Sequence, residues 1–289
     1  MSYAYYPGCS AHSTARDMHE SSLAVAKALG IELAEITGWT CCGASAAHQT
    51  DRALAASLAA ANLVLAKEMG LDMVVNCAAC YNRSKTANYE VLNSPTMRES
   101  VAQALGQPYD GSVAVRHFVE VLLKDIGLPK LRKSFHQSLN GLKVACYYGC
   151  YLVRPPEVTQ FDDTENPTIL ENLVEAMGGE SLDWSGKVDC CGGALNLTRT
   201  EITVQRSAAI IEMAQAAGAD CIAVACPMCQ TSLDLRQKDI EKATGKRYNL
   251  PVVYITQLLG LCLGIQPKEL GFNRLMVTPD AVTKAVGRQ

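Results

Sequence analysis

Ten of the thirteen cysteines in this chain fall into two sets of five with nearly the same internal spacing. Each set has a single cysteine, an adjacent pair, and a final Cys-x-x-Cys pair. In both sets 34 residues separate the adjacent pair from the Cys-x-x-Cys pair, and the last four cysteines are offset by 149 positions. The first set is Cys9, Cys41, Cys42, Cys77 and Cys80; the second is Cys150, Cys190, Cys191, Cys226 and Cys229. Duplication explains this pattern, and clustered cysteines in a reducing compartment favour metal binding.

Five thiolates are one more than the common metal sites use. Structural zinc is saturated by four ligands, and an ordinary cubane 4Fe–4S cluster also takes four thiolates. Neighbours such as Cys41 and Cys42 do not easily occupy two separate corners of one cubane. They can serve an opened or bridged cluster in which one thiolate spans two irons. The excess of ligands therefore points away from an ordinary electron-transfer cubane, and zinc in the second set is a minor alternative.

Strands and helices alternate in the apolar pattern around these cysteines. Strands are predicted at residues 2–6, 31–36, 73–76, 142–148 and 221–225, and helices at residues 14–29, 51–69 and 201–217, with a polar helix after Cys80. Such alternation implies a parallel sheet in each half. Ligands of these sheets gather beyond the carboxyl ends of the strands, near helix N-termini, so the five cysteines of each half can converge there.

The predicted fold class is therefore α/β, with two pseudo-symmetric Rossmann-like halves, each a small parallel sheet with flanking helices. The predicted domains are residues 1–139 and 140–289, because the boundary falls near residues 137–141, between the last helix of the first half and the first strand of the second. Three cysteines remain outside the two sets. Cys146, Cys221 and Cys262 have apolar neighbours and are predicted to be buried as small hydrophobic side chains.

His12 follows Cys9 by three residues and is the one candidate catalytic side chain, since an imidazole there could donate a hydrogen bond or a proton. The alternative is that His12 is an ordinary polar residue whose hydrogen bonds are satisfied and that has no catalytic role. His48 is a weaker candidate, and the other histidines have no motif around them: His19, His117 and His136.

Cationic residues offer a further possibility near the cysteines. Arg83 and Lys85 lie just after Cys80 and could bind an anionic substrate, although solvated helix residues are the simpler interpretation. Arg154 has the same two interpretations.

The composition excludes several classes of function. The chain has 289 residues, 48% of them hydrophobic and 19% charged, which is typical of a globular protein. A formal charge of −3 and an aromatic content of 6% give no basis for nucleic-acid binding. The most apolar stretch, residues 252–265, is shorter than the roughly 20 residues of a membrane span, and the N-terminus lacks a secretory pattern. We expect a cytoplasmic protein without direct membrane insertion.

The pattern Cys–Cys-Cys-Gly–Cys-x-x-Cys, present twice, resembles the cysteine-rich CCG domains of the heterodisulfide reductase B subunit family. The resemblance covers nearly the whole chain. The motifs that carry it are Pro7-Gly8-Cys9, Cys41-Cys42-Gly43, Asn76-Cys77, Tyr148-Gly149-Cys150, Cys190-Cys191-Gly192-Gly193, Cys226-Pro227-Met228-Cys229 and the loop that begins at Arg154.

This resemblance implies that each set of five cysteines binds a noncubane 4Fe–4S cluster. A disulfide substrate would lie between the two clusters, each sulfur meeting an iron as the bond breaks; in methanogens it is the mixed disulfide of coenzyme M and coenzyme B. Electrons would come from a C-like subunit with ferredoxin-type 4Fe–4S clusters, fed by an A-like subunit with flavin and iron–sulfur groups. Two clusters also suit a two-electron reaction, since an iron–sulfur cluster passes one electron at a time.

The expected function is thus a catalytic, disulfide-reducing subunit. The alternative is a non-catalytic electron-transfer iron–sulfur subunit of a hydroxy-acid or quinone-linked oxidoreductase complex, because related cysteine-rich domains occur there. Those complexes usually carry ferredoxin-like Cys-x-x-Cys-x-x-Cys runs on the same chain or a partner chain, and this chain has none.

Overall fold

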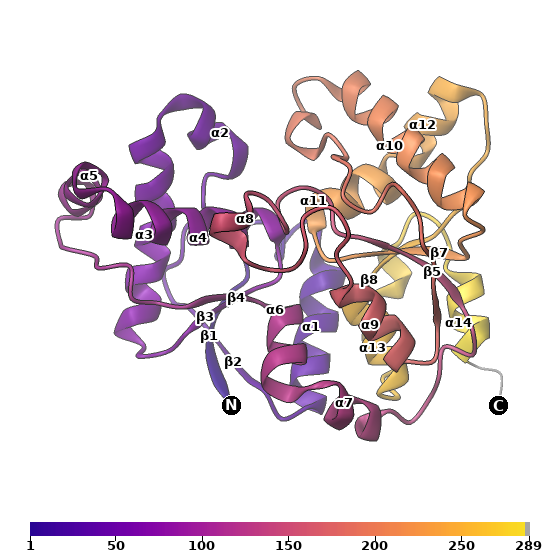
Figure 1. Ribbon diagram of the computed structural model, residues 1–289. Coiled ribbons are helices and arrows are strands. Elements are labelled where there is room, and N and C mark those ends of the chain that lie inside the picture. The colour runs from indigo at the N-terminus through magenta and orange to yellow at the C-terminus, as the bar shows by residue number, and fades with distance from the viewer. Residues whose placement is uncertain (287–289) are drawn as a thin grey trace.

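The computed structural model describes residues 1–286, which form two α/β halves that lie against each other (Figure 1). Each half contains a four-stranded sheet, in the order β2-β1-β3-β4 and β6-β5-β7-β8. All neighbouring strands in these sheets are parallel. The strands are β1 (Ser2–Tyr6), β2 (Glu32–Glu35), β3 (Met73–Val75), β4 (Val115–His117), β5 (Lys143–Tyr147), β6 (Glu180–Ser181), β7 (Cys221–Val224) and β8 (Val252–Tyr254).

The two helices of the first half that begin at Arg52 and Pro95 have side-chain caps. The Asp51 carboxylate accepts a hydrogen bond from the backbone N–H of Leu54 at 2.7 Å and caps the helix that begins at Arg52. The Ser94 hydroxyl accepts one from the backbone N–H of Met97 and caps the helix that begins at Pro95. The helices of the first half are α1 (Arg16–Ala28), α2 (Ala44–Thr50), α3 (Arg52–Glu68), α4 (Ala78–Asn93), α5 (Pro95–Leu105), α6 (Phe118–Glu120), the π-helical turn η1 (Val121–Ile126) and α7 (Leu128–Ser134).

The second half repeats the central strands but has different peripheral helices. A long loop with the short α8 (Pro156–Thr159) replaces the direct entry into a helix after the first strand (Figure 1). The remaining elements are α9 (Ile169–Ala176), η2 (Gly193–Leu195), α10 (Thr200–Ala216), α11 (Pro227–Gln230), η3 (Thr231–Leu235), α12 (Gln237–Thr244), α13 (Ile255–Cys262), η4 (Phe272–Arg274) and α14 (Asp280–Val286).

The structure confirms the predicted fold class of two pseudo-symmetric α/β halves with parallel sheets. The predicted helix after Cys80 starts earlier than expected, at Ala78, so Cys80 lies inside the first turn of α4. Three strands escaped the sequence analysis, namely β4, β6 and β8. They are only two or three residues long, which is too short for a period-2 pattern to be recognised. The domain boundary between residues 139 and 140 stays a prediction.

The strand registers show which residues of the two halves are equivalent. In the first sheet Tyr6 pairs with Val75, and in the second Tyr147 pairs with Val224, which is 149 positions after Val75. Tyr6 therefore corresponds to Tyr147. One position earlier, Tyr5 corresponds to Cys146, so the extra cysteine of the second half occupies a buried strand position.

Buried contacts fix the two halves relative to each other. Ser21 Oγ on α1 lies 2.8 Å from Thr256 Oγ1 on α13, and both residues are buried. From α4, Tyr81 OH donates a hydrogen bond to the carbonyl of Thr159 at 2.8 Å, and Asn82 Nδ2 donates to the carbonyl of Arg154 at 2.8 Å. Because α4 begins with Cys77 at its N-cap, these bonds also fix the first cysteine set relative to the second half. Within residues 1–286, no helix has both the length and the apolar character to cross a membrane.

Candidate functional site

The ten motif cysteines lie beyond the carboxyl ends of the central strands, in equivalent places in the two sheets. Each single cysteine follows the first strand of its half, and each adjacent pair follows the second. Cys77 and Cys226 are the N-cap residues of α4 and α11, and the last cysteine of each set lies in the first turn of these helices. The structure thus brings together the cysteines of each set where parallel sheets generally place their ligands.

In the first set the sulfurs form one connected group. Cys42 Sγ lies 3.5 Å from Cys80 Sγ, and hydrogen bonds also join Cys42 to Cys41 and Cys80 to Cys77. Cys9 is close enough to raise the pKa of Cys41 electrostatically, after the larger contributions of the Cys42 hydrogen bond and burial. Cys9 and Cys41 are exposed, whereas the other three cysteines are buried.

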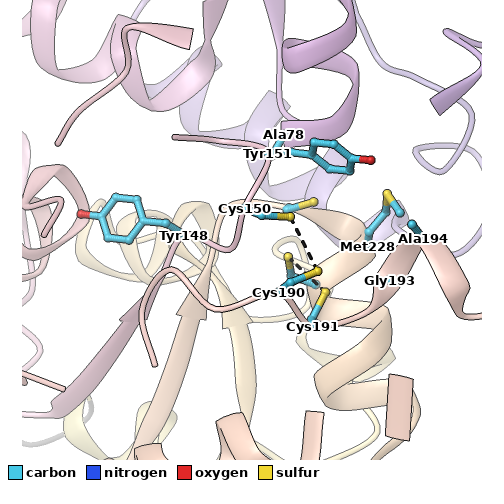
Figure 2. A pocket seen from close by; sticks show the side chains of 11 residues that line it. Ala78, Tyr148, Cys150, Tyr151, Cys190, Cys191, Gly193, Ala194 and Met228 are labelled. Carbon is cyan, nitrogen blue, oxygen red and sulfur yellow. Dashed lines mark hydrogen bonds between the residues drawn. The ribbon is translucent and has the colours of Figure 1, made fainter. Parts of the chain in front are cut away.

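The second set surrounds a cavity. Cys150 Sγ lies 3.8 Å from Cys190 Sγ, and Cys191 Sγ lies 3.8 Å from Cys229 Sγ. Figure 2 shows Cys150, Cys190 and Cys191 pointing toward one another beneath the ring of Tyr151. All five cysteines of the set line the cavity, together with Ala78, Tyr148, Tyr151, Gly193, Ala194 and Met228. Ala78 comes from α4 of the first half, so the cavity lies at the contact between the halves.

The two cysteine sets contact each other directly. Cys77 and Cys226 are near enough to shift each other's pKa, raising that of Cys77 and lowering that of Cys226, and both side chains are buried. Each of these cysteines begins the helix of its own half, so the two sets approach each other at these helix starts.

His117 links the backbones of these two cysteine turns. Its ring is 2% exposed, and burial lowers its pKa, so the imidazole is neutral. The backbone N–H of Val119 donates to Nδ1 at 3.3 Å, which leaves the proton on Nε2. Nε2 lies 2.9 Å from the carbonyl of Asn76 and 3.1 Å from that of Ala225, the residues just before Cys77 and Cys226. One N–H therefore bridges the two sets.

Two equivalent tyrosines support the adjacent cysteine pairs. Tyr6 OH donates to the carbonyl of Thr40 at 2.8 Å, and Tyr147 OH donates to the carbonyl of Asp189 at 2.6 Å. Each of these carbonyls belongs to the residue just before an adjacent cysteine pair. The same bond in both halves thus holds the backbone that presents the pair.

Two equivalent glycines leave room for the last cysteine of each set. A Cβ on Gly8 would lie 3.1 Å from Cys80 Sγ, and a Cβ on Gly149 would lie 3.1 Å from Cys229 Sγ. Both glycines also have positive φ, +73° and +65°, a conformation that costs other residues energy. The glycine of each Gly-Cys motif therefore allows the turn of the backbone and also leaves room for the sulfur of the last cysteine in the set.

The second cysteine of the adjacent pair has a lowered pKa in both halves, whereas the first cysteine of the pair differs, because the pKa of Cys41 is raised and that of Cys190 is lowered. Hydrogen bonds with Cys41 and Cys80 lower the pKa of Cys42, and the hydrogen bond with Cys229 lowers the pKa of Cys191. In the second set the bond with Cys150 lowers the pKa of Cys190 to about 6. Because a metal binds the thiolate rather than the thiol, these cysteines are prepared for ligation at neutral pH.

Arg83 is a buried cation between the two sets. Its side chain is 8% exposed, Nη2 donates to Tyr151 OH at 3.3 Å, and its Cζ lies 5.2 Å from the centroid of the Tyr151 ring. Its Nε has no hydrogen-bond partner in the described structure. The interpretation of Arg83 as a solvated helix residue is wrong, because the loop after Cys150 covers it.

The other residues singled out from the sequence have varied surroundings. His12 is exposed, with Nε2 3.5 Å from Glu35 and its ring stacked on Trp39. Lys85 is half-buried and donates to the carbonyl of Thr159 at 2.8 Å, so it too is tied to the second half. Arg154 binds the Glu165 carboxylate at 2.8 Å within its own loop.

The remaining histidines and cysteines lie outside this group of thiols. His48 and His136 are exposed, and the Nδ1 atom of His19 lies 3.0 Å from Tyr5 OH. The three cysteines outside the sets are buried, as their apolar neighbours predicted: Cys146, Cys221 and Cys262.

The donor groups fit an anionic iron–sulfur cluster in each half. Each half gathers five thiols beyond one sheet edge, and thiolates are the usual ligands of such clusters. The unpaired Nε of Arg83 and the unpaired hydroxyl of Tyr254 are buried donors near these thiols, and both would gain from an anionic neighbour. In residues 1–286, no three histidine, cysteine, aspartate or glutamate side chains are arranged around a single-ion site.

Sequence reasoning missed His117 and only partly anticipated Arg83. His117 had no motif around it, and Arg83 was a candidate to bind an anionic substrate, with a solvated helix residue as the simpler interpretation. A possible signal for His117 was its position at the end of a short apolar run, where parallel strands deliver functional side chains. Nothing in the local sequence distinguishes Arg83 from an ordinary helix cation, because the residues that bury it come from the other half.

Comparison with known proteins shows two matches to the cysteine-rich CCG domain, at residues 3–83 and 144–234. The chain is 36% identical over 252 residues to the B subunit of the ferredoxin/F420H2-dependent CoB–CoM heterodisulfide reductase of Methanosarcina acetivorans, covering 85% of this chain and 84% of that one. It is 32% identical over 293 residues to a protein of Archaeoglobus profundus that is similar to the heterodisulfide reductase B subunit, covering 98% and 97%.

A relative with a different name matches equally well. The 8-methylmenaquinol:fumarate reductase membrane anchor subunit of Wolinella succinogenes is 33% identical over 276 residues, covering 95% of this chain and 96% of that one. Among solved structures, a hypothetical protein from Helicobacter pylori superimposes with a TM-score of 0.77 over 96% of this chain at 12% identity. This chain spans about half of that one, 52%, and the likeness concerns the fold alone.

Proposed function

Because this chain belongs to the heterodisulfide reductase B subunit family, whose members carry two cysteine-rich CCG domains, we propose that it is the catalytic, disulfide-reducing subunit of a multi-subunit complex. The observation that carries the proposal is the contact between the two complete cysteine sets through Cys77 and Cys226. A purely structural duplication would not need the two cysteine sets to lie next to each other. A reaction in which two one-electron donors act on one substrate needs both sets close to that substrate.

The ten motif cysteines are the proposed ligands of two noncubane 4Fe–4S clusters, one in each half. When bound, these clusters supply the two electrons that convert a disulfide and two protons into two thiols. The cavity enclosed by the five cysteines of the second set is the space that the second cluster would fill. The aromatic rings of Tyr148 and Tyr151 and the side chain of Met228 line the same cavity, so the edge of that site suits the uncharged sulfur end of a disulfide.

His12 is the proposed proton donor on the side of the first set. Its imidazole is exposed beside Glu35, and Cys9 of the first set lies three residues before it. The Nε2 atom of His12 lies 3.5 Å from the Glu35 carboxylate, and an imidazole in this place could give a proton to a leaving thiolate. His12→Gln is then expected to slow disulfide turnover without lowering the iron content of the protein.

The proposed partners are an A-like subunit with flavin and iron–sulfur groups and a C-like ferredoxin-type subunit, since this chain has no cubane motif of its own. The proposed compartment is the cytoplasm, where reducing conditions keep all thirteen cysteines as the free thiols of this structure. The substrate is proposed to be a disulfide of the coenzyme M–coenzyme B type or an analogue.

The test is anaerobic purification with the associated chains, followed by iron and acid-labile sulfide analysis and single-turnover assays with candidate disulfides. Cys77→Ser and Cys226→Ser are expected to abolish turnover. Cys221→Ala is the matched control, because this buried cysteine lies outside both sets. A protein with full iron that reduces no disulfide but exchanges electrons with its partners would contradict the catalytic proposal.

That outcome would favour a second function, an electron-transfer subunit of a quinone-linked oxidoreductase. The relative from Wolinella succinogenes is the specific observation behind it. In this case the exposed cysteines of the first set, Cys9 and Cys41, would lie on the side of electron entry or exit. Co-purification with a quinol-oxidising or hydroxy-acid-oxidising partner, together with cluster oxidation by that partner's substrate, would establish it.

A further inference from the structure

Arg83 is a buried cation without a carboxylate partner. In the described part of the chain two cationic side chains are buried, Arg83 and Lys187, at 8% and 6% exposure. Lys187 lies 3.0 Å from the Glu171 carboxylate. Within residues 1–286, no aspartate or glutamate oxygen lies within the 4.0 Å of an ion pair with Arg83. The buried lysine is therefore neutralised by the protein, and the buried arginine is not.

The contacts that Arg83 does make are too weak to offset its burial. They are the hydrogen bond to Tyr151 OH at 3.3 Å and the stacking of its guanidinium at 5.2 Å from the centre of the same ring. The attraction between a cation and an aromatic ring is several times smaller than the cost of burying an uncompensated charge. The free Nε has no acceptor at all. The functional state is expected to supply an anion at this position.

The position of Arg83 indicates which anion this is. Arg83 follows Cys80 by three residues on α4, so both lie on neighbouring turns of one helix face. Hydrogen bonds with Cys41 and Cys80 lower the pKa of Cys42, and the charge of Arg83 acts in the same direction. The guanidinium thus lies beside the buried sulfurs of the first set. A thiolate-ligated iron–sulfur cluster is the anionic group these sulfurs would hold.

The equivalent position in the second half is neutral. The offset of 149 positions that relates the two Cys-x-x-Cys pairs takes Arg83 to Ser232. Ser232 Oγ donates to the carbonyl of Met228 at 2.9 Å and is also within hydrogen-bonding distance of Cys191, the counterpart of Cys42. This position thus holds a permanent charge in one half and a hydroxyl in the other. A second cation, Arg206, donates to the Cys190 carbonyl at 3.3 Å, but it is exposed and its charge is paired with Asp189 at 3.4 Å.

From this difference we propose that Arg83 makes the cluster of the first set easier to reduce than the cluster of the second. The inference rests on the proposed function, because it requires a cluster in each half. Reduction adds one electron and one negative charge to a cluster, and a nearby fixed positive charge stabilises the more negative state. The first electron is then held by the first set. The second set, which lines the open cavity, keeps the lower potential and is the stronger one-electron donor.

The test is a redox titration of the anaerobic holoprotein, followed by electron paramagnetic resonance, without any disulfide present. Arg83→Gln is expected to lower the potential of one cluster by at least the 59 mV that corresponds to a tenfold change for one electron. Arg83→Lys, which keeps the charge, is expected to shift it less. Ser232→Ala is the matched control from the second half and should leave the higher potential unchanged.

Variants that retain only one cluster show which cysteine set has the potential that Arg83 changes. In Cys191→Ala, which is expected to retain only the first cluster, adding Arg83→Gln should lower the remaining potential. In Cys42→Ala, which is expected to retain only the second, adding Arg83→Gln should leave the potential unchanged. If Arg83→Gln loses iron, restoration of iron by Arg83→Lys supports the role of the charge, and loss in both variants overturns it.

Unchanged potentials in Arg83→Gln with full iron would overturn the proposal. If the same variant then needs more of an anionic disulfide for half-maximal rate, Arg83 binds the substrate and not the cluster. Equal shifts in both clusters would also overturn it, since a charge beside one set must act more strongly on that set. Absence of disulfide turnover would refute the proposed catalytic function while leaving these potentials interpretable.

Discussion

The two halves share a strand order and a cysteine spacing, yet they surround their cysteines differently. In the first half Cys9 and Cys41 are exposed and a buried arginine lies beside the set. In the second half Cys190 is also exposed, Cys150 is half-buried, all five cysteines line a cavity, and a serine takes the place of the arginine. The ligands and the backbone that presents them are repeated, whereas the charge and access around them are not.

Equivalent positions show where the repetition matters. Both halves have a tyrosine whose hydroxyl donates to the carbonyl before the adjacent cysteine pair, Tyr6 and Tyr147. Both also have a glycine beside the last cysteine of the set, Gly8 and Gly149. The residues that end the last strand of each sheet differ, because His117 pairs with Val75 and Tyr254 pairs with Val224. Positions that shape the ligand backbone are thus alike, and positions between the sets are specialised.

The largest expected effect comes from removing one ligand of either set. Cys42→Ala and Cys191→Ala should each reduce the iron and sulfide content to roughly half, because each set is proposed to hold its own cluster. Cys262→Ala, outside both sets, should leave the content unchanged. Colorimetric iron and sulfide analysis of anaerobically prepared protein measures this. Retention of full iron by either variant would show that the cysteine is not a ligand.

The second-largest expected effect is a difference in stability between variants of His117 and of its counterpart Tyr254. His117→Ala removes a buried ring and the hydrogen bond that joins the two cysteine turns, so the free energy of unfolding should fall by about 3–5 kcal/mol. Tyr254→Phe removes a buried hydroxyl without a partner and should change it by less than about 1 kcal/mol in the metal-free chain.

Denaturant unfolding under reducing conditions compares these two variants. His117→Gln is the conservative control, since its amide can still donate to a carbonyl. If His117→Ala and Tyr254→Phe lose equal stability, the bridge from His117 to Asn76 and Ala225 is not what distinguishes the two strand ends.

A buried carboxylate of the second half gives a pH-dependent effect. Burial raises the pKa of Asp234 to about 6, compared with about 3.9 for an exposed aspartate. The folded chain therefore holds this proton over a range where the unfolded chain has lost it, and the stability from this group falls as the pH rises from about 4 to about 6. Lys85 occupies the equivalent place in the first half, 149 positions earlier, and carries no carboxyl group.

Asp234→Asn removes this titration. Relative to the wild-type protein, the variant should gain up to about 3 kcal/mol of stability between pH 4 and pH 7, from two pKa units at 1.36 kcal/mol each. Unfolding curves at several pH values measure the difference. Burial also raises the pKa of Asp17 to about 6, and the Asp234 carboxylate raises it further. Asp17 is present in both proteins, and the loss of this repulsion in the variant adds a smaller gain of the same sign. A difference that is constant with pH would show that Asp234 titrates normally.

The smallest effect concerns the glycines beside the sulfurs. Gly8→Ala, Gly149→Ala and Gly30→Ala should each cost about 1–2 kcal/mol, because all three residues have positive φ. A Cβ on Gly30 meets nothing within 4 Å, whereas at the other two it lies 3.1 Å from a cysteine sulfur. Gly8→Ala and Gly149→Ala should therefore also lower the iron content, and Gly30→Ala should not. Unfolding and iron analysis of the three variants test this together.

Much of this arrangement could be predicted from the sequence, because it depends on local spacing. The cysteine motifs and the alternation of strands and helices fixed the fold class and the convergence of each set, since parallel strands present their carboxyl ends at one edge. The short strands β4, β6 and β8 were not predicted, because two or three residues carry no periodic pattern and, unlike the equally short β3, none of them runs directly into a cysteine motif. With β4 unrecognised, His117 had no expected place in the site.

The sequence by itself determined the ten thiols, their division into two sets and the parallel sheets that carry them. Only the tertiary structure decided that the sets meet at Cys77 and Cys226, that His117 bridges their turns, and that Arg83 is buried without a carboxylate. The physical reason is that these three features depend on contacts between the halves, which lie far apart along the chain. Spacing determines which residues a turn presents, and packing between halves determines what faces them.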